Sequence, residues 1–328
     1  MNCLAVKVPI KEAEEIRQKI KAFLRDDLRT DKDVDFVYFP VQESIAKEMK
    51  DLWLVKRDLK KREMNPVEEI KSSYDVIGDI AILPLDIEDE ERALVLLGRK
   101  NINVLLKRLS PIEGKHRTRR LKYIGGEKRT ETIHKEHGCF YKLDVEKTYF
   151  SPRLSTERLR VVKKMERGDF VIDMFAGIGP FSILAAKKGC RVLSVDNNPY
   201  AIRYLRENKS LNRIKNLDIL LGDSGKVLAK GKNVADHVIM NLPFSSHKFL
   251  DTALRLAKEN GRIYFYSIGR EEDLFGEQIR EIEERIGKFR LYEKRVVRPY
   301  SPYRYHVCIE FGTGKGFINC STQKRTKI

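Results

Sequence analysis

The stretch that decides the fold runs from Val171 to Ser182 and reads V-I-D-M-F-A-G-I-G-P-F-S. An apolar segment ends on an acid, Asp173, and turns through two glycines, Gly177 and Gly179, before a helical segment. A second apolar segment ends on Asp196, in S-V-D-N-N-P-Y. Glycines let the backbone approach a ligand closely, and the second acid can accept hydrogen bonds from ribose hydroxyls. The pattern predicts a site for a cofactor that contains adenosine.

Two kinds of cofactor fit such a turn, a dinucleotide and S-adenosylmethionine (SAM). The dinucleotide fingerprint has a third glycine and places a pyrophosphate at the helix N-terminus. Here Phe181 and Ser182 replace that glycine, after a Pro180 that suits a first helical turn. Asp173, directly before the loop, would repel a pyrophosphate, whereas SAM carries a sulfonium and an ammonium and no phosphate. We therefore expect SAM.

Length and composition exclude several classes of protein. The 328 residues are enough for two or three domains. No apolar run approaches the roughly 18 residues that a membrane span needs, and the start of the chain lacks a signal-peptide pattern. The five cysteines are scattered, without a C-x-x-C, which argues against a disulfide framework. We expect a cytoplasmic protein with no membrane partner.

Positive charge is concentrated in one part of the chain. Lys and Arg number 65 against 48 Asp and Glu, which gives a net charge of +17. Between Arg99 and Arg129 there are eleven basic residues and two acids. Such an excess belongs either to a charge-rich surface with ion-pair networks or to a surface that binds a polyanion. Its concentration favours nucleic acid.

Apolar periodicity and turn residues divide the chain into three modules. Residues 1–70 are predicted to form a small α/β module, residues 71–150 a basic α+β module, and residues 151–328 the cofactor domain. The tail after Gly312 is predicted to be disordered. The elements predicted in the first two modules are helices at 11–24, 43–54 and 88–99, strands at 34–41, 74–83 (with a turn at Gly78) and 103–109, and a hairpin of 131–133 with 139–144.

The third module alternates strands and helices, which implies a parallel, doubly wound sheet. Its predicted strands are 170–174, 191–196, 217–221, 237–241, 261–267, 289–297 and 305–311. The connection between the last two strands, Arg298 to Tyr303, is too short for a crossover, so these strands must pair antiparallel. Seven strands with one reversed form the class I SAM-dependent methyltransferase fold, preceded here by two smaller modules.

Two further segments of the sequence contain candidate catalytic residues. Asn241-Leu242-Pro243-Phe244 follows the fourth strand of this module and resembles the [Asp/Asn/Ser]-Pro-Pro-[Tyr/Phe] signature of methyltransferases that act on planar nitrogens, with Leu242 as a departure; an ordinary Asn-x-Pro turn is the alternative. Glu157 follows Ser155 and Thr156, so it is either a helix-cap acid or a general base at the mouth of the pocket. The sequence leaves both readings of Glu157 open.

Four motifs together resemble the archaeal and eukaryotic tRNA (guanine-37-N1)-methyltransferase family. They are R-T-E-T-I-H-K-E-H-G (129–138), F-S-P-R-L-S-T-E-R (150–158), D-M-F-A-G-I-G-P-F (173–181) and M-N-L-P-F-S-S-H-K-F (240–249). The resemblance covers about residues 70–311 and is much weaker over residues 1–70.

The resemblance implies SAM-dependent methylation of N1 of guanosine 37 in tRNA by a monomer that contacts the anticodon loop and the elbow. Residues 1–70 are expected to contact the tRNA as well. Glu157 would accept the N1 proton, and Arg117 would stabilise negative charge on O6, which makes the N1 lone pair available for attack on the methyl group. Asp196 would bind the ribose, and Asn241 with Pro243 would contact the base.

The expected cofactor-binding residues follow the predicted strands: Asp173, Phe175, Gly177, Gly179, Asp196, Asn197, Asp223 and Asn241. The expected RNA contacts are cationic or aromatic: Arg119, Arg120, Arg129, Tyr149, Arg153 and Arg158, with His116 in the same patch. Phe150 is either a second stacking residue or part of the core.

Other activities stay open. A wyosine-pathway enzyme would transfer the aminocarboxypropyl group of SAM, and a bifunctional variant would also methylate C7 of 4-demethylwyosine. A non-catalytic RNA-binding protein with a degenerate methyltransferase fold would not need to retain Asp173, Asp196, Asn241 and Glu157 together. His134-x-x-His137-x-Cys139 has no fourth ligand at a fitting spacing, so we expect no metal.

Overall fold

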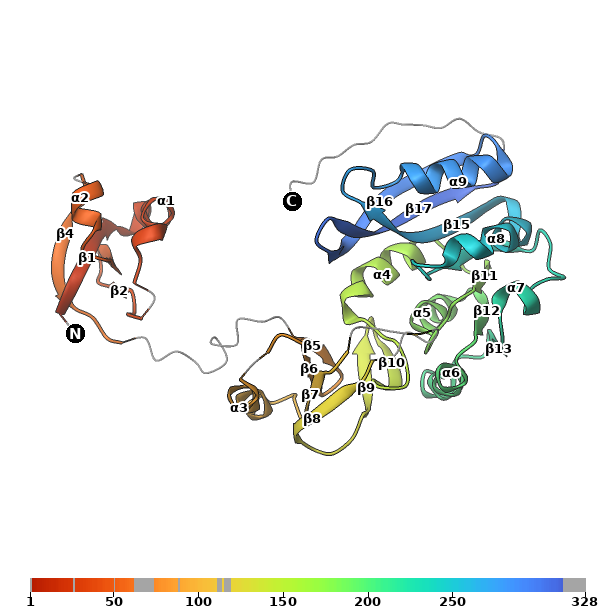
Figure 1. Cartoon of the computed structure of the whole chain (residues 1–328), viewed down its shortest axis with the longest axis horizontal. Coiled ribbons are helices and arrows are strands. Elements are labelled where there is room, and N and C mark those ends of the chain that lie inside the picture. Colours follow the sequence, from red (N-terminus) through yellow and green to blue (C-terminus); the bar gives the residue numbers. More distant parts are fainter. Residues whose placement is uncertain are drawn as a thin grey trace. The chain divides into compact units, whose positions relative to one another are not determined.

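The structure is a computed structural model that describes residues 2–25, 27–49, 51–61, 74–87, 89–110, 114 and 119–314. It divides into two compact units, residues 1–71 and residues 72–328, which are described separately. Their elements are labelled in Figure 1. The tail that we predicted to be disordered lies outside the described residues from position 315 on.

The first unit is a four-stranded antiparallel sheet with short helices. Its strands are β1 (Asn2–Pro9), β2 (Asp31–Lys32), β3 (Phe36–Pro40) and β4 (Leu54–Asp58), in the order β2-β3-β1-β4. Its helices are α1 (Ala13–Lys19), flanked by 3-10 turns at Ile10–Glu12 and Lys21–Phe23, and α2 (Ile45–Glu48). Ile20 and Ile45 pack with Val6, Val8 and Phe39 in one core cluster.

The sequence was misleading for part of this unit. The helix predicted at 43–54 is wrong over most of its length, because only Ile45–Glu48 is helical and β4 begins at Leu54. Pairing of β4 with β1 supplies hydrogen bonds that a longer helix would have made internally. β1 was not predicted, because residues on both of its faces are buried and no polar alternation marks it.

The second unit begins with a four-stranded sheet and a hairpin. The sheet has the order β5 (Asp75–Ile77), β6 (Ile80–Leu83), β7 (Val104–Arg108), β8 (Leu121–Gly126), with α3 (Glu90–Ala93) and a 3-10 turn at Leu94–Gly98 beside it. The hairpin joins β9 (Glu131–Glu136) to β10 (Cys139–Asp144). The predicted turns are confirmed, since Gly78, His137 and Gly138 have positive φ angles of 59°, 48° and 72°. β8, within the basic stretch, was not predicted.

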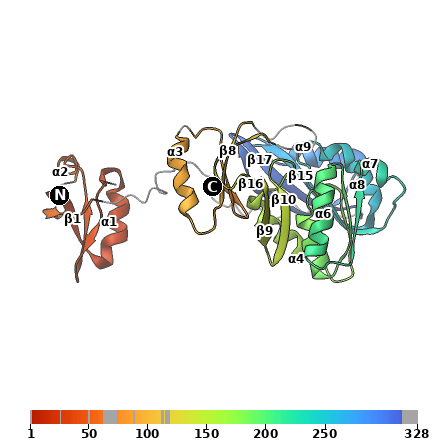
Figure 2. The ribbon, with the colours of Figure 1, turned by 90° about the horizontal axis from the view of Figure 1, so that it is seen from below.

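Two asparagines fix the hairpin to the cofactor domain. Asn208 lies in helix α6 (Pro199–Leu211), and Asn212 directly follows that helix. Asn208 Oδ1 accepts from Lys142 N at 2.6 Å, and its Nδ2 donates to Lys142 O and to Ile178 O. Asn212 bonds Phe140 N and Phe140 O in the same way. The two side chains therefore satisfy backbone groups of β10 that a further strand would otherwise bond, and Figure 2 shows α6 alongside β10.

The rest of the second unit is built on one seven-stranded sheet. In chain order its strands are β11 (Phe170–Asp173), β12 (Arg191–Asp196), β13 (Leu217–Leu221), β14 (Ala235–Met240), β15 (Ala257–Arg270), β16 (Arg290–Ser301) and β17 (Arg304–Gly312). Their spatial order is β13-β12-β11-β14-β15-β17-β16. β17 is antiparallel to both of its neighbours, and the other pairs are parallel. The predicted class I methyltransferase fold is confirmed.

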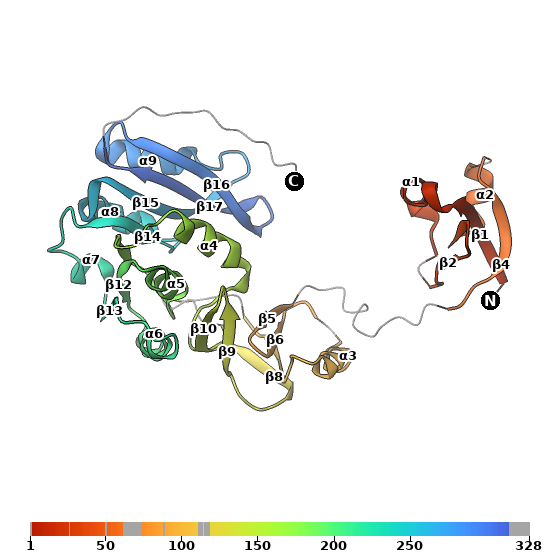
Figure 3. The same ribbon diagram turned by 180° about the vertical axis from the view of Figure 1, so that it is seen from behind.

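Helices cover both faces of this sheet. Those are α4 (Ser155–Lys163), α5 (Pro180–Lys188), α6, α7 (Ser224–Val227), α8 (Leu250–Leu256) and α9 (Gly276–Ile286). Side chains of α4, α5 and α6 share one core cluster, and those of α8 and α9 share another. The first cluster also takes in β6 and β10, so the basic module and the cofactor domain have a common core. Figure 3 shows the helices and the strands of this sheet from behind.

Membrane insertion by helices has no support in the described part of the chain, where each helix is too short or too polar to cross a bilayer.

Candidate functional site

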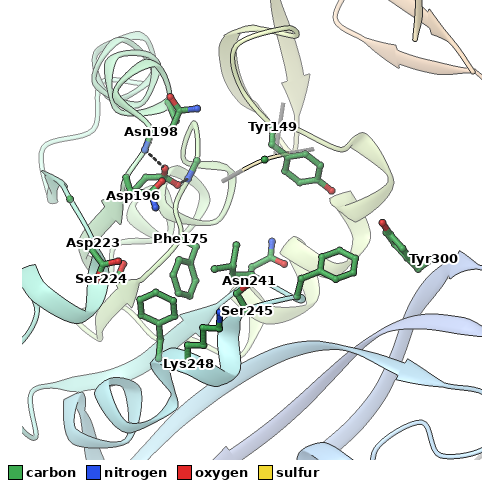
Figure 4. Close-up of a pocket in the computed structure, with 18 residues that line it drawn as sticks. Tyr149, Phe175, Asp196, Asn198, Asp223, Ser224, Asn241, Ser245, Lys248 and Tyr300 are labelled. Atoms are coloured by element: carbon green, nitrogen blue, oxygen red, sulfur yellow. Dashed lines mark hydrogen bonds between the residues drawn. The ribbon is translucent and has the colours of Figure 1, made fainter. Parts of the chain in front are cut away.

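A pocket of about 400 Å³ opens at the carboxyl ends of the parallel strands β11 to β14. In an open α/β sheet this edge is where ligands bind, next to the strand pair at which the order reverses, here β11 and β14. Figure 4 shows its side chains. The lining consists of Gly114, Tyr149, Phe175, Gly177, Asp196, Asn197, Asn198, Ala201, Gly222, Asp223, Ser224, Asn241, Leu242, Phe244, Ser245, Lys248, Phe249 and Tyr300.

The glycine loop and the acid of β12 are bonded to each other. Gly177 N donates to Asp196 Oδ2 at 2.7 Å, and Asn198 N donates to Asp196 Oδ1 at 2.8 Å, as Figure 4 shows. Gly177 and Gly179 have φ angles of 55° and 90°, which favour glycine. A side chain at Gly179 would also overlap Leu205. The loop is thus fixed to Asp196, which lines the pocket.

The acid of β11 lies beneath the loop rather than in the pocket lining. Asp173 is fully buried and accepts from Ser182 Oγ at 2.6 Å, and Ser194 Oγ donates to Ser182 at 2.7 Å. Its second oxygen, Oδ1, has no hydrogen-bond partner among the described residues. Burial, with a smaller contribution from Asp196, raises the pKa of Asp173 to about 7. Such an acid is one that a nearby cation would stabilise in its ionised form.

The far end of the pocket combines polar and aromatic groups. Asp223 caps α7 and lines the pocket beyond β13, and Asn197 follows β12. The rings of Phe175 and Phe249 meet edge to face at 5.0 Å. Ser224 is fixed by donating to the backbone oxygen of Met174. An apolar ring pair between hydrogen-bonding groups suits a purine and its ribose.

The Asn-Leu-Pro-Phe turn places one of its two predicted residues in the pocket. Asn241 lines it, directly after β14, whereas Pro243 is buried and lines a second cavity instead. The Leu242 carbonyl accepts from Ser245 N at 2.9 Å and from Ser246 N at 2.8 Å. That oxygen is therefore used within the turn, and the Asn241 amide is the polar side chain that the turn presents to a ligand.

Glu157 lies outside the pocket lining and is 4% exposed. Arg160 Nη2 donates to its Oε1 at 2.6 Å and Arg160 Nε to its Oε2 at 2.8 Å. Tyr266 Oη donates to Oε1 at 2.8 Å, and Arg295 Nε lies 3.5 Å from Oε2. Glu157 also lies in the first turn of α4, where a negative charge interacts favourably with the helix dipole, so its position is compatible with both of its predicted roles.

Arg160 joins Glu157 to two other acids. It contacts Glu310, and its Nη1 lies 3.1 Å from Glu293, while Lys164 Nζ lies 2.5 Å from Glu293 and 2.7 Å from Glu310. Despite its burial, the hydrogen bonds and charges of these acids raise the pKa of Arg160 further above its usual value. Helix α4 and the β16–β17 hairpin are therefore linked through charged groups.

The predicted RNA-binding residues fall into different environments. Arg129 bonds Asp79 and Glu127, Arg153 Nε donates to Asp75 at 2.7 Å, and the buried Arg158 binds both oxygens of Glu136. Arg120 is exposed, whereas Arg119 is buried with Nη1 lacking a partner among the described residues, and burial lowers its pKa. Tyr149 lines the pocket, and Phe150 packs in the core. Arg117 and His116 lie outside the described residues.

The His134–Cys139 segment has structural contacts. His134 Nδ1 accepts from Gly78 N at 3.1 Å, and His137 Nε2 lies 2.9 Å from Ser155 Oγ. No group of three metal-ligating side chains occurs in the described ranges.

Several lining residues were not predicted. Asn198, the N-cap of α6, was recognisable from the D-N-N-P order, since asparagine before proline starts helices. Lys248 and Phe249 follow the turn that contains Asn241, so their proximity could have been inferred. Tyr300, in contrast, reaches the pocket from the C-terminal hairpin, and no local signal indicates this.

Comparisons with known proteins agree with this fold. Residues 132–293 match the TRM5/TYW2 methyltransferase domain, residues 55–130 the TYW2 N-terminal domain, and residues 5–50 the tRNA methyltransferase 5 N-terminal domain. The chain is 41% identical to the tRNA (guanine(37)-N(1))-methyltransferase Trm5b of Pyrococcus abyssi, over 94% of this chain and 98% of that protein. It is 37% identical to the tRNA(Phe) (4-demethylwyosine(37)-C(7)) aminocarboxypropyltransferase of Methanocaldococcus jannaschii, over 72% and 96%.

Solved structures show the same relationship. The complex of aTrm5 with tRNALeu has a TM-score of 0.68 at 32% identity and covers 94% of this chain and 99% of that one. The crystal structure of M. jannaschii TYW2 in complex with AdoMet has a TM-score of 0.57 at 32% identity, over 73% and 98%. Given these matches and the seven-stranded sheet with its one reversed strand, the chain belongs to the TRM5/TYW2 methyltransferase family.

Proposed function

We propose that this chain methylates N1 of guanosine 37 in tRNA, with SAM as the methyl donor. The observation that carries this proposal is the 41% identity to a tRNA (guanine(37)-N(1))-methyltransferase over nearly the full length of both chains. The match of residues 5–50 to a tRNA methyltransferase 5 N-terminal domain supports it further, because the wyosine-pathway relative aligns with only 72% of this chain.

The residues of the pocket fit SAM. Asp196 is oriented to bind ribose hydroxyls, and Asn197, Asp223, Phe175 and Phe249 would hold the adenine. Among the described residues Asp173 Oδ1 has no hydrogen-bond partner, and a cationic ligand nearby would stabilise the ionised form of this acid. SAM supplies an electrophilic methyl group when bound, and it needs no metal ion.

The residues proposed to act on the target guanine have different roles. The Asn241 amide would hold the guanine edge, and Glu157 would accept the N1 proton while Arg117 stabilises charge on O6. Glu157 is bound to Arg160 and Tyr266 outside the pocket lining. Its proposed role therefore requires the carboxylate to turn from Arg160 toward the pocket when tRNA is bound.

A direct test compares tRNA transcripts that differ at one nucleotide. We expect the chain to transfer labelled methyl groups from SAM to a transcript with guanosine 37, and not to the same transcript with adenosine 37. Equal transfer to both would contradict N1 of guanosine 37 as the target.

A second candidate is methylation of C7 of 4-demethylwyosine as an additional activity, or aminocarboxypropyl transfer. The match of residues 55–130 to a TYW2 N-terminal domain favours it. A tRNA that carries 4-demethylwyosine distinguishes C7 methylation from aminocarboxypropyl transfer, since the two reactions add different masses to the nucleoside.

A further inference from the structure

Two arginines stand opposite each other beside the pocket. Arg270 ends β15 and Arg304 begins β17, and they are partners in the antiparallel register. Both are exposed, and neither guanidinium bonds another side chain within the described residues. Opposite residues of an antiparallel pair lie on one face about 5 Å apart, and like charges there destabilise the pairing. An anion between the two guanidinium groups would remove this repulsion.

The arginines line a second cavity, of about 640 Å³, that adjoins the first. Phe244 lines both cavities, and so joins them. Three acids of α9, Glu277, Glu281 and Glu284, line the same cavity. These acids would repel a polyanion, so an anionic chain would follow the side of Phe244 and the arginines.

The hairpin that presents Arg304 has the composition of a nucleic-acid surface. From Lys294 to Ile309 it has four basic residues and no acid. Tyr300 and Tyr303 are 41% and 71% exposed. The Tyr300 ring meets the Phe244 ring edge to face at 5.1 Å, and in Figure 4 it lies at the end of the pocket away from Asp223. Exposed aromatic rings beside cations can stack on bases while the cations bind phosphates.

We propose that the tip of the β16–β17 hairpin is an RNA-binding element, in which Arg270 and Arg304 together hold one backbone phosphate next to the target nucleotide and Tyr300 stacks on a base. This inference rests on the proposed function and deepens it, because it assigns the tRNA a contact on the side of the pocket formed by the C-terminal hairpin. The charges and rings fit a single-stranded loop, whose bases are free to stack.

The test uses the full chain and unmodified guanosine-37 transcript, with tRNA affinity measured at several salt concentrations. The logarithm of the tRNA association constant falls as the logarithm of the salt concentration rises. Losing one phosphate contact makes this slope less steep by about 0.7 for a single strand. We expect this change in the Arg270→Ala/Arg304→Ala double variant. Tyr300→Leu should weaken tRNA binding by about 5- to 150-fold, and Tyr300→Phe, which keeps the ring, should not.

Arg280→Ala is the matched control, because Arg280 lines the same cavity but already pairs with Asp273 at 3.2 Å. It should keep the wild-type slope, and both it and the double variant, whose arginines lie outside the lining of the first pocket, should bind SAM as wild type does. A double variant with the wild-type slope and affinity would overturn the proposed phosphate site. If wild type transfers no methyl group to guanosine 37, the proposed function fails, whereas the salt slopes still test the RNA contact by itself.

Discussion

Glu157 and Arg160 lie one turn apart on α4, and the Arg160 guanidinium binds both carboxylate oxygens of Glu157, at 2.6 and 2.8 Å. Tyr266, from β15, donates to the same carboxylate. The proposed proton acceptor is therefore held by two elements, in a position from which substrate binding would have to release it.

Replacing Glu157 tests that assignment. Glu157→Gln keeps the shape of the side chain but removes the proton acceptor, so the single-turnover rate of methyl transfer should fall by about 10²- to 10⁴-fold. SAM affinity, measured by calorimetry, should change little, because Glu157 lies outside the pocket lining. A near-wild-type rate would exclude Glu157 as the base.

Arg160 should matter for stability. Arg160→Ala removes the nearest guanidinium of the buried Glu157 and one of the cations that bind the buried Glu310, and breaking such a buried pair costs about 3–5 kcal/mol. The measurement is urea unfolding. As a control, Arg203→Ala removes an exposed pair with Glu207 and should cost less than about 1 kcal/mol. Similar losses in both variants would show that the α4 network adds no special stability.

Asp196 should determine SAM affinity. Asp196→Ala removes the acceptor expected to bind ribose and also frees the backbone nitrogen atoms of Gly177 and Asn198. We expect a marked loss of SAM binding in calorimetry. Asp218→Ala, at an exposed position of the neighbouring strand β13, is the control and should bind normally. If Asp196→Ala binds SAM like the control, the ribose role is wrong.

The pH dependence of stability reports on Asp173. Its pKa is raised from 3.8 to about 7, so between these values the folded chain retains a proton that the unfolded chain has lost. The free energy of unfolding contributed by this group is therefore highest at low pH and falls as pH rises toward 7. Asp173→Asn should remove this dependence, so its stability relative to wild type should increase from about pH 5 to about pH 7.5 in urea unfolding. A constant difference across that range would show that Asp173 does not retain the proton.

The parts of the fold that could be predicted are those with local signals. The bounds of β12 and β13 were correct, because each is a short apolar run between helices and turns. The antiparallel β16–β17 pair followed from the length of one loop. The predicted helix at 43–54 failed because strand pairing with β1, far away in the sequence, outweighed local helical periodicity.

In the candidate site, too, the residues with a local sequence signal could be predicted and the contacts between distant segments could not. Residues at or just past the ends of strands, such as Asp196, Asp223 and Asn241, could be placed in a pocket because parallel strands end at one edge. The contacts of Glu157 with Tyr266, and of Phe244 with Tyr300, join segments more than 50 residues apart. They depend on how α4 and the hairpin pack, which periodicity does not encode.

The most direct test of the proposed activity is the identity of the product. The chain should be incubated with SAM and an unmodified guanosine-37 transcript, and nuclease fragments should be analysed by mass spectrometry. We predict one added methyl group, located on N1 of the guanosine at position 37. Methylation at another nucleotide or another atom of guanosine 37, or transfer of an aminocarboxypropyl group, would contradict the proposed function.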